Sequence, residues 1–285
     1  MISARVIKDS IGPSKVRLTT FVLTYPRYIH AEVMTHRMFS RNASSSSAIP
    51  VKKALAAIRR DMVVPIHIGA NKAGMQADKE VSAWRKWLAV CLWKGLGHIA
   101  CVAAWMLDRL GVHKQVVNRV TEPWSHITVV VTATDWANFL ALRYHPAAQP
   151  EIQVLAQEIY LGLNTSTPDK LKAGEWHLPF VDQLEIDAEA AEPRAGVYAP
   201  IRRSVARCAR VSYNNHDGTH SSLAQDTDLY RRLLGAQPIH ASPAEHQARA
   251  TKSNKYSGNL RGWVQYRKTL PNENVKTFTG PLESE

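Results

Sequence analysis

The stretch from Glu32 to Pro50 gathers the side chains best suited to chemistry. Its polar members include, in chain order, His36, Arg37, Ser40, Asn42 and Ser44 to Ser47. Serine and asparagine side chains bond to nearby backbone groups, so they favour turns over helix. A loop of this kind offers hydroxyl and N–H donors that suit a phosphate group. The alternative interpretation is a helix cap followed by a polar surface turn.

Three segments resemble motifs of the flavin-dependent thymidylate synthases. The first matches that family's His-Arg-x-x-Ser-x-Asn-x-x-Ser pattern at His36, Arg37, Ser40, Asn42 and Ser45. The second comprises residues 138–143 with 148–152, and the third comprises 209–213 with 240–246. In the family the third block normally precedes the first. The order found here predicts a circular permutation, which is feasible because domain termini often lie close together.

The resemblance gives Arg143 the catalytic role. Its guanidinium would bind the uracil ring and stabilise the negative charge left when N3 loses a proton. A guanidinium is always charged and presents a planar fork of donors, so it suits an anionic ring edge. The alternative is structural, because the helix dipole stabilises a cation at a helix C-terminus.

The resemblance divides the other motif residues between two ligands. Residues implied in binding FAD are His36, Arg37, Asn42, Asn138, His240, Ser242 and Glu245. Residues implied in binding the pyrimidine deoxynucleotide monophosphate are Glu32, Ser45, Ser46, Ser47, Arg119 and Arg143. Ser242 and Glu245 also predict a capping box, and the two roles are compatible because a helix N-terminus can face a flavin diphosphate.

Several positions depart from the family pattern. The family usually has arginine at 35 and 47, glutamate at 43, glutamine at 32 and an Asn-x-Arg pair at 132 and 134. This chain has Thr35, Ser47, Ala43, Glu32, Thr132 and Thr134 there. Each lost arginine removes a charge-assisted hydrogen bond worth ~1.5–3 kcal/mol. Arg41, Lys52 and Lys53 are candidates to compensate, and a different pyrimidine or a loss of activity are alternatives.

The resemblance implies a thymidylate synthase that transfers a one-carbon unit from methylenetetrahydrofolate to C5 of dUMP. Hydride would come from reduced FAD, with NADPH reducing the flavin, in a homotetramer with active sites at subunit interfaces. One alternative is a hydroxymethylating or otherwise altered pyrimidine-nucleotide enzyme on the same scaffold. Another is a nucleic-acid-binding protein without catalysis, which the net charge of +12 would suit. The scattered basic residues favour small anions over nucleic acid.

The cysteines Cys91, Cys101 and Cys208 have no paired spacing. We expect reduced thiols in a cytoplasmic protein, with neither a disulfide framework nor a metal site. Flavin-free thymidylate synthases use a cysteine nucleophile. Here Cys91 and Cys101 lie in apolar surroundings that raise a thiol pKa, and Cys208 lacks the Pro-Cys-His setting of that class. The sequence therefore favours hydride chemistry without a cysteine nucleophile.

The periodic segments predict an α+β fold with a mostly antiparallel sheet flanked by long helices. Strands are predicted at 15–24 and 127–132. Predicted helices run from Pro26 toward His36, from Pro50, over 135–143 with Thr134 as N-cap, from Pro150, and over 200–210 and 226–234. We expect one domain over 1–285, with 164–198 as a peripheral connection.

The most apolar segment, residues 79–110, predicts a long helix that breaks near Gly95 and Gly97. Charged residues interrupt it, so it predicts a buried helix of a protein outside the membrane. The residues expected to face the core are Trp84, Leu88, Cys91, Leu92 and His98.

Overall fold

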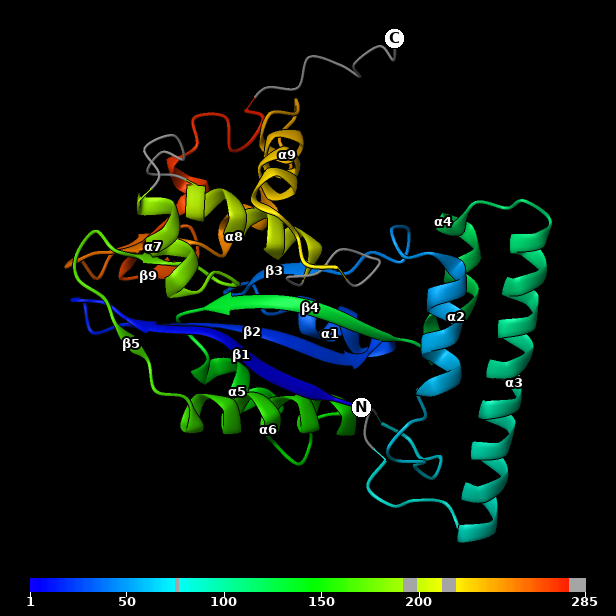
Figure 1. The fold of residues 1–285 in the computed structure, drawn as a ribbon. Coiled ribbons are helices and arrows are strands. Elements are labelled where there is room, and N and C mark those ends of the chain that lie inside the picture. The colour runs from blue at the N-terminus through cyan, green and yellow to red at the C-terminus, as the bar shows by residue number, and fades with distance from the viewer. Residues whose placement is uncertain (75–76, 192–198, 212–218, 277–285) are drawn as a thin grey trace.

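A five-stranded sheet with the order β3-β4-β2-β1-β5 lies at the centre of the molecule (Figure 1). The computed structural model describes residues 1–74, 77–191, 199–211 and 219–276. The strands are β1 (Ser3–Ile11), β2 (Arg17–Pro26), β3 (Ser40–Ala43), β4 (His126–Ala133) and β5 (Asp169–Lys170). Neighbours pair antiparallel except β1 with β5. The sheet and its flanking helices confirm the predicted α+β class.

One face of the sheet is covered by α5 (Ala137–Arg143) and α6 (Pro150–Thr165) (Figure 1). Helix α6 begins at the predicted Pro150, which needs no N–H partner at a first helical position. Its residues Ile152, Leu155 and Ile159 pack into the main core beneath β2 and β4. A Cβ at Gly162 would lie 2.7 Å from Phe21 Cε1, so this glycine allows the helix to approach the sheet closely.

The C-terminal part of the chain covers the other face. Its elements are β6 (Trp176–His177), α7 (Gln183–Ala191), α8 (Ala199–Arg210), α9 (Leu223–Leu234), η3 (Ser242–Glu245), β7 (Ala248–Ala250), β8 (Tyr256–Ser257), β9 (Leu260–Arg261), β10 (Trp263–Gln265) and η4 (Tyr266–Thr269). Strands β10, β7 and β6 form a small antiparallel sheet. The buried Asp226 on α9 forms ion pairs with Arg207 and Arg210 on α8. Helices α8 and α9 confirm the helices predicted at 200–210 and 226–234.

A helical group stands beside the sheet (Figure 1). Its elements are α2 (Val51–Arg60), α3 (Ala83–Arg109), α4 (Lys114–Val117) and η2 (Asn118–Trp124). Helix α3 is continuous through Gly95 and Gly97, so the predicted break is wrong. By length and composition α3 could cross a membrane, which for a single helix is weak evidence.

The orientation predicted for α3 is also wrong. The residues expected to face the core, Trp84, Leu88, Cys91, Leu92 and His98, are exposed. The buried residues are instead Gly97, Ala100, Cys101 and Ala104. The helix is apolar around most of its circumference, so its periodicity does not select one face. Small residues select the buried face because they allow close contact with α2 and η2.

Four local predictions differ from the structure. Helix α5 begins at Ala137, and the Thr134 hydroxyl donates to Asp135 Oδ2 at 2.8 Å instead of capping it. Residues 242–245 form a 3-10 turn without a side-chain cap, so the predicted capping box is absent from this described turn. The helix predicted toward His36 is the short pair η1 (Arg27–Ile29) and α1 (His30–Met34). Residues 40–43, predicted as a turn, pair with β4 as an edge strand.

Candidate functional site

The first two motifs meet at a contact between His36 and Arg143. Arg143 is the last residue of α5, and His36 lies in the turn that leads from α1 into β3. Arg143 Nε donates a hydrogen bond to His36 Nε2 at 3.0 Å. Phe139 on α5 packs edge-on against the imidazole, with ring centroids 4.8 Å apart. Packing and the hydrogen bond therefore fix the imidazole relative to the guanidinium.

The surroundings of His36 set its charge. Burial, with the nearby cations Arg143 and Arg41, lowers the pKa of His36 below its ordinary value. The ring is therefore neutral at pH 7. Because Nε2 accepts from Arg143, the single N–H of the neutral ring lies on Nδ1. The pair presents a guanidinium cation beside a neutral imidazole, which suits an electron-rich or anionic ring.

Three residues implied in FAD binding already have partners within the chain. Asn42 on β3 donates through Nδ2 to the Cys208 carbonyl at 2.8 Å. Its Oδ1 accepts from Ser242 Oγ at 3.4 Å. Glu245 forms an ion pair with Arg267 on η4. The first two contacts tie β3 to α8 and η3, so the third sequence motif lies beside the first.

The remaining predicted contacts are not gathered at one point. Exposed side chains among them are Arg37, Asn138, His240 and Arg119. Arg119 lies 3.9 Å from Glu122, so this cation is partly neutralised by its own chain. Glu32 Oε2 is buried and has no hydrogen-bond partner among the described residues. Among these predicted contacts, Glu32 is therefore the residue whose buried carboxylate oxygen most needs a hydrogen-bond donor.

Thr132, where the family usually has asparagine, belongs to a buried chain of hydrogen bonds. Its members, in order of contact at 2.7–2.9 Å, are Ser10, His177, Thr20, Thr132 and His246. Burial lowers the pKa of His246 to about 3 and that of His177 well below its ordinary value, so both rings are neutral. Thr132 is fully enclosed and has protein partners. It therefore does not face a ligand in this structure.

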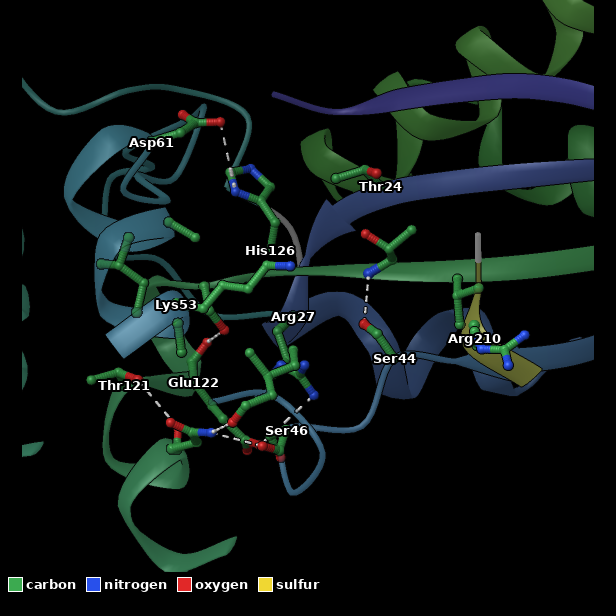
Figure 2. Close-up of a pocket in the computed structure, with 18 of the residues that line it drawn as sticks. Thr24, Arg27, Ser44, Ser46, Lys53, Asp61, Thr121, Glu122, His126 and Arg210 are labelled. Carbon is green, nitrogen blue, oxygen red and sulfur yellow. Dashed lines mark hydrogen bonds and ion pairs between the residues drawn. The ribbon is translucent and has the colours of Figure 1, made fainter. Parts of the chain in front are cut away.

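A cavity of about 930 Å³ lies on the face of the sheet away from α6 (Figure 2). Residues of α2 and η2 form one wall, and residues of α8 and α9 form another. Thr24 and Thr128, partners across β2 and β4, line it from the sheet. Further polar residues in its wall include Arg27, Ser44, Ser46, Lys53, Glu122, His126 and Arg210.

The serine-rich loop meets this cavity in a fixed conformation. Asn118, buried on η2, donates through Nδ2 to the carbonyls of Ser46 and Ile49 at 2.7 and 2.9 Å. Ser46 lines the cavity, whereas Ser45 and Ser47 are not among its lining residues in the described chain. Of the serines implied in nucleotide binding, the structure thus places one in the cavity.

The cavity wall also contains a partly buried cation that sequence reasoning missed, Arg27. Arg27 directly follows β2, and its guanidinium lies 3.7 Å from Glu122. Burial lowers the pKa of Arg27, although an arginine stays charged at pH 7. Its Nε is buried with no hydrogen-bond partner in the described part of the chain. Since an unsatisfied buried donor costs ~1–3 kcal/mol, the cavity favours an anionic ligand that can accept from it.

One family model matches the part of the chain that contains the first two motifs. The family model described as thymidylate synthase complementing protein matches residues 14–169, more than half of the chain. The chain belongs to this family. The matched range contains His36, Arg143 and the serine-rich loop, whereas the blocks at 209–213 and 240–246 lie outside it. Ser212 and Tyr213 in those blocks also lie outside the described residues.

Solved structures resemble this family member only weakly. The UMP/dUMP methylase PolB from Streptomyces cacaoi bound with 5-Br UMP gives a TM-score of 0.48 and 15% identity, over 57% of this chain and 88% of that one. The same enzyme bound with 5-Br dUMP gives a TM-score of 0.43 and 17% identity, over 53% of this chain and 68% of that one. Thymidylate Synthase X from Helicobacter pylori with FAD and dUMP gives a TM-score of 0.37 and 14% identity, over 52% of this chain and 69% of that one. Comparison with curated protein sequences gives no match.

Proposed function

We propose that this chain is a flavin-dependent thymidylate synthase that transfers the one-carbon unit of methylenetetrahydrofolate to C5 of dUMP. The hydrogen bond between Arg143 and His36 carries the proposal, because it joins two motifs of the family at one place. Bound FAD would supply the hydride, after reduction by NADPH. Donors that fit a flavin on this chain are the exposed Arg37 and Asn138 and the Nδ1–H of His36.

Arg143 would act on the pyrimidine. Its Nε is bound to His36, which holds the plane of the guanidinium and leaves the terminal nitrogens to face the ring. Two N–H donors aimed at O2 and N3 would stabilise the ring after N3 loses its proton. Charge delocalised from N3 increases the electron density at C5, the atom that accepts the carbon unit. A neutral His36 helps because it adds no second positive charge beside the guanidinium.

The cysteines support chemistry without a thiolate nucleophile. Burial raises the pKa of the thiols of Cys101 and Cys208, so both are protonated at pH 7. Cys208 is fully enclosed and accepts from Gln247 Nε2 at 3.5 Å. Cys91 is exposed on α3, away from the residues that line the cavity. None of the three is among the residues that line the cavity in the described part of the chain.

The cavity would take the phosphate of the nucleotide. Arg27 and Lys53 supply positive charge there, and Ser46 supplies a hydroxyl. Arg143 and His36 are not among the lining residues that the structure describes. One active site needs both sets within the length of one nucleotide. In the homotetramer that the family resemblance implies, a site at a subunit interface would combine the two sets.

The test uses Arg143→Ala and Arg143→Lys. We expect oxidation of the reduced flavin, measured with dUMP and methylenetetrahydrofolate, to fall about 10²–10³-fold in Arg143→Ala. Arg143→Lys should fail almost as badly, since lysine keeps the charge and loses the planar fork. FAD affinity, measured by thermal stabilisation on adding FAD, should stay near the wild-type value.

Arg231→Ala is the control, because Arg231 is likewise an arginine in the last turn of a helix, but an exposed one. It should turn over normally. Normal turnover by Arg143→Ala would make Arg143 a helix-end charge and remove the basis of the proposal. Loss of FAD from a folded Arg143→Ala protein would make the residue a cofactor contact instead.

A further inference from the structure

Glu122 places a negative charge in a cavity whose other features suit an anion. It belongs to η2 and lines the cavity together with Arg27 (Figure 2). Its Oε1 lies 3.7 Å from Arg27 Nη1 and 3.9 Å from Arg119 Nη1. Both distances exceed the length of a hydrogen bond, so one carboxylate oxygen lies between two cations without bonding to either. Glu122 therefore neutralises part of their charge and occupies the space between them.

The other carboxylates in the cavity wall are paired more closely within the chain. Asp228 on α9 forms an ion pair with Arg232 at 3.0 Å. Asp61 accepts a hydrogen bond from the amino group of Met1. Among the carboxylates that line the cavity in the described chain, Glu122 alone has no cation within 3.5 Å. Its charge is therefore the least compensated of those that a ligand would meet.

Main-chain contacts, and not the carboxylate, hold η2 in place at this point. The backbone carbonyl of Glu122 accepts from Ser125 N at 3.1 Å and from Ser125 Oγ at 2.9 Å. The Ser125 carbonyl accepts from the Arg27 N–H at 2.9 Å, which joins the end of η2 to the end of β2. A glutamine at position 122 would keep these contacts. The negative charge of Glu122 therefore needs an explanation in the cavity.

The size of the cavity does not limit the number of phosphate groups that it could hold. Its volume of about 930 Å³ is near the upper end of the range for sites that enclose a drug-sized ligand, about 300–1,000 Å³. Basic side chains besides Arg27 line it at Lys53, Arg60, Arg210 and Arg232. Volume and overall charge would therefore admit a nucleoside triphosphate as readily as a monophosphate. Discrimination between them requires a negative charge at a particular point.

We propose that Glu122 restricts the cavity to nucleoside monophosphates by repelling a second phosphate group. This rests on the proposed function, which places the nucleotide phosphate in the cavity. The first phosphate would accept from Arg27 Nε, which has no partner among the described residues, and from the Ser46 hydroxyl. A second phosphate that extends from Arg27 toward Arg119 would meet Glu122 Oε1 between them. An ionised carboxylate only accepts hydrogen bonds, so the second phosphate would meet a like charge where it needs a donor.

The repulsion from Glu122 grows with the charge of the ligand. A phosphate monoester carries about −1.5 to −2 charges at pH 7, and a triphosphate carries roughly twice as many. The Coulomb energy with one fixed carboxylate is proportional to the ligand charge and falls with distance. A monophosphate bound at Arg27 need not approach Arg119, so it stays farther from the carboxylate oxygen. Removing the charge of Glu122 should therefore strengthen the binding of a triphosphate more than that of a monophosphate.

Titration calorimetry on the full chain, with FAD present and divalent metal ions absent, compares the Kd values of dUMP and dUTP. The wild type should bind dUMP at least about tenfold more tightly than dUTP. Glu122→Gln keeps the shape and removes the charge, so it should lower the Kd for dUTP at least about tenfold more than the Kd for dUMP. Glu158→Gln is the matched control, because it makes the same change at a half-buried glutamate of α6, across the sheet. It should keep the wild-type ratio.

Glu122→Asp separates the effect of charge from that of shape. It keeps the negative charge on a shorter side chain, so its ratio of Kd values should stay closer to the wild type than to Glu122→Gln. A Glu122→Asp protein that behaves like Glu122→Gln would overturn the proposal, because shape would then decide the preference.

The remaining outcomes distinguish this proposal from the proposed function. An unchanged ratio in a folded Glu122→Gln protein that still binds dUMP would overturn the role of Glu122 and leave the proposed function standing. A wild type that binds dUTP as tightly as dUMP would do the same. A wild type that binds neither nucleotide would overturn both the role of Glu122 and the placement of the phosphate in the cavity.

Discussion

The two faces of the central sheet come from the same strands and differ in chemistry. Toward α6, β2 and β4 place Phe21, Leu23 and Val131 in the main apolar core. On the other face the cross-strand pairs are Thr20 with Thr132, Val22 with Val130, and Thr24 with Thr128. The first of these pairs belongs to the buried hydrogen-bond chain, and the last lines the cavity.

This difference teaches that stability and binding are assigned to alternate residues of one strand. Successive side chains of a strand point to opposite faces, so neighbours in sequence experience different surroundings. The apolar face contributes burial, which stabilises the fold. The other face, called the polar face below for its threonines, changes along its length from an enclosed network, through the buried apolar pair Val22 and Val130, to an open cavity. Substitutions at adjacent positions should therefore affect different properties.

The largest stability loss is expected on the apolar face. Phe21 is fully buried and packs against Trp136 with ring centroids 5.2 Å apart. Phe21→Ala should cost about 3–5 kcal/mol in the free energy of unfolding, measured with urea, because it leaves a cavity in the core. Val22→Ala, one residue along on the other face, is the control and should cost less. Equal losses would contradict the division between the faces.

Acid should selectively weaken the polar face. The pKa of His246 is about 3 in the folded protein, against an ordinary value of 6.5. The unfolded chain therefore binds more protons below pH 6.5, so this stabilisation is complete above that pH and is lost as pH falls. At pH 5 the loss is about 2 kcal/mol from His246 alone. His246→Gln should reduce the slope of unfolding free energy against pH between 7.5 and 5, and an unchanged slope would refute the assignment.

Two threonines on β4 compare the enclosed and open ends of the polar face. Thr132→Val removes the partner of His246 Nδ1 inside the buried network, which should cost about 1–3 kcal/mol. Thr128→Val makes the same chemical change at the cavity and should stay within about 0.5 kcal/mol. Urea unfolding of both variants measures the difference. A larger loss for Thr128→Val would mean that the cavity lining is structural.

Much of this fold could be predicted from strongly patterned segments. The predicted strand 127–132 is β4 at 126–133, and the predicted helix 200–210 is α8 at 199–210. Strands β1 and β3 could not be found in this way, because their composition is mixed: β1 is stabilised mainly by pairing with the neighbouring β2, and β3 by pairing with the distant β4. For α3 the sequence established a long apolar helix but did not decide which side its own chain covers.

The candidate site likewise has one part that the sequence predicted and one part that it did not. The motifs implied both Arg143 and His36. In the structure Arg143 Nε lies 3.0 Å from His36 Nε2. The cavity could not be predicted, because Arg27, Asn118 and Arg210 come from separate segments that only the tertiary fold brings together. Each is an ordinary polar residue in its local sequence. Asn118 is informative because it is buried, and Arg27 because it is partly buried with an unpartnered Nε among the described residues.

The smallest expected effect concerns two adjacent serines of the loop. Ser46 lines the cavity, whereas Ser45 is exposed and accepts from the Ser47 N–H at 3.2 Å. If the cavity holds the nucleotide phosphate, Ser46→Ala should raise the Kd for dUMP about fivefold, the worth of one neutral hydrogen bond. Titration calorimetry with FAD present measures it. The free energies of unfolding of Ser46→Ala and Ser45→Ala should both lie within about 0.5 kcal/mol of the wild-type value.

Ser45→Ala is the matched control, since it removes the same hydroxyl one residue away. The family motif matches Ser45, and the cavity selects Ser46, so the two variants distinguish the two assignments. Weaker dUMP binding in Ser45→Ala alone would place the phosphate outside the cavity and leave Thr24 and Thr128 without a role in binding. Weaker binding in Ser46→Ala alone would make the polar face of the sheet the binding face. An unchanged affinity for dUMP in both variants would mean that neither serine hydroxyl binds the nucleotide.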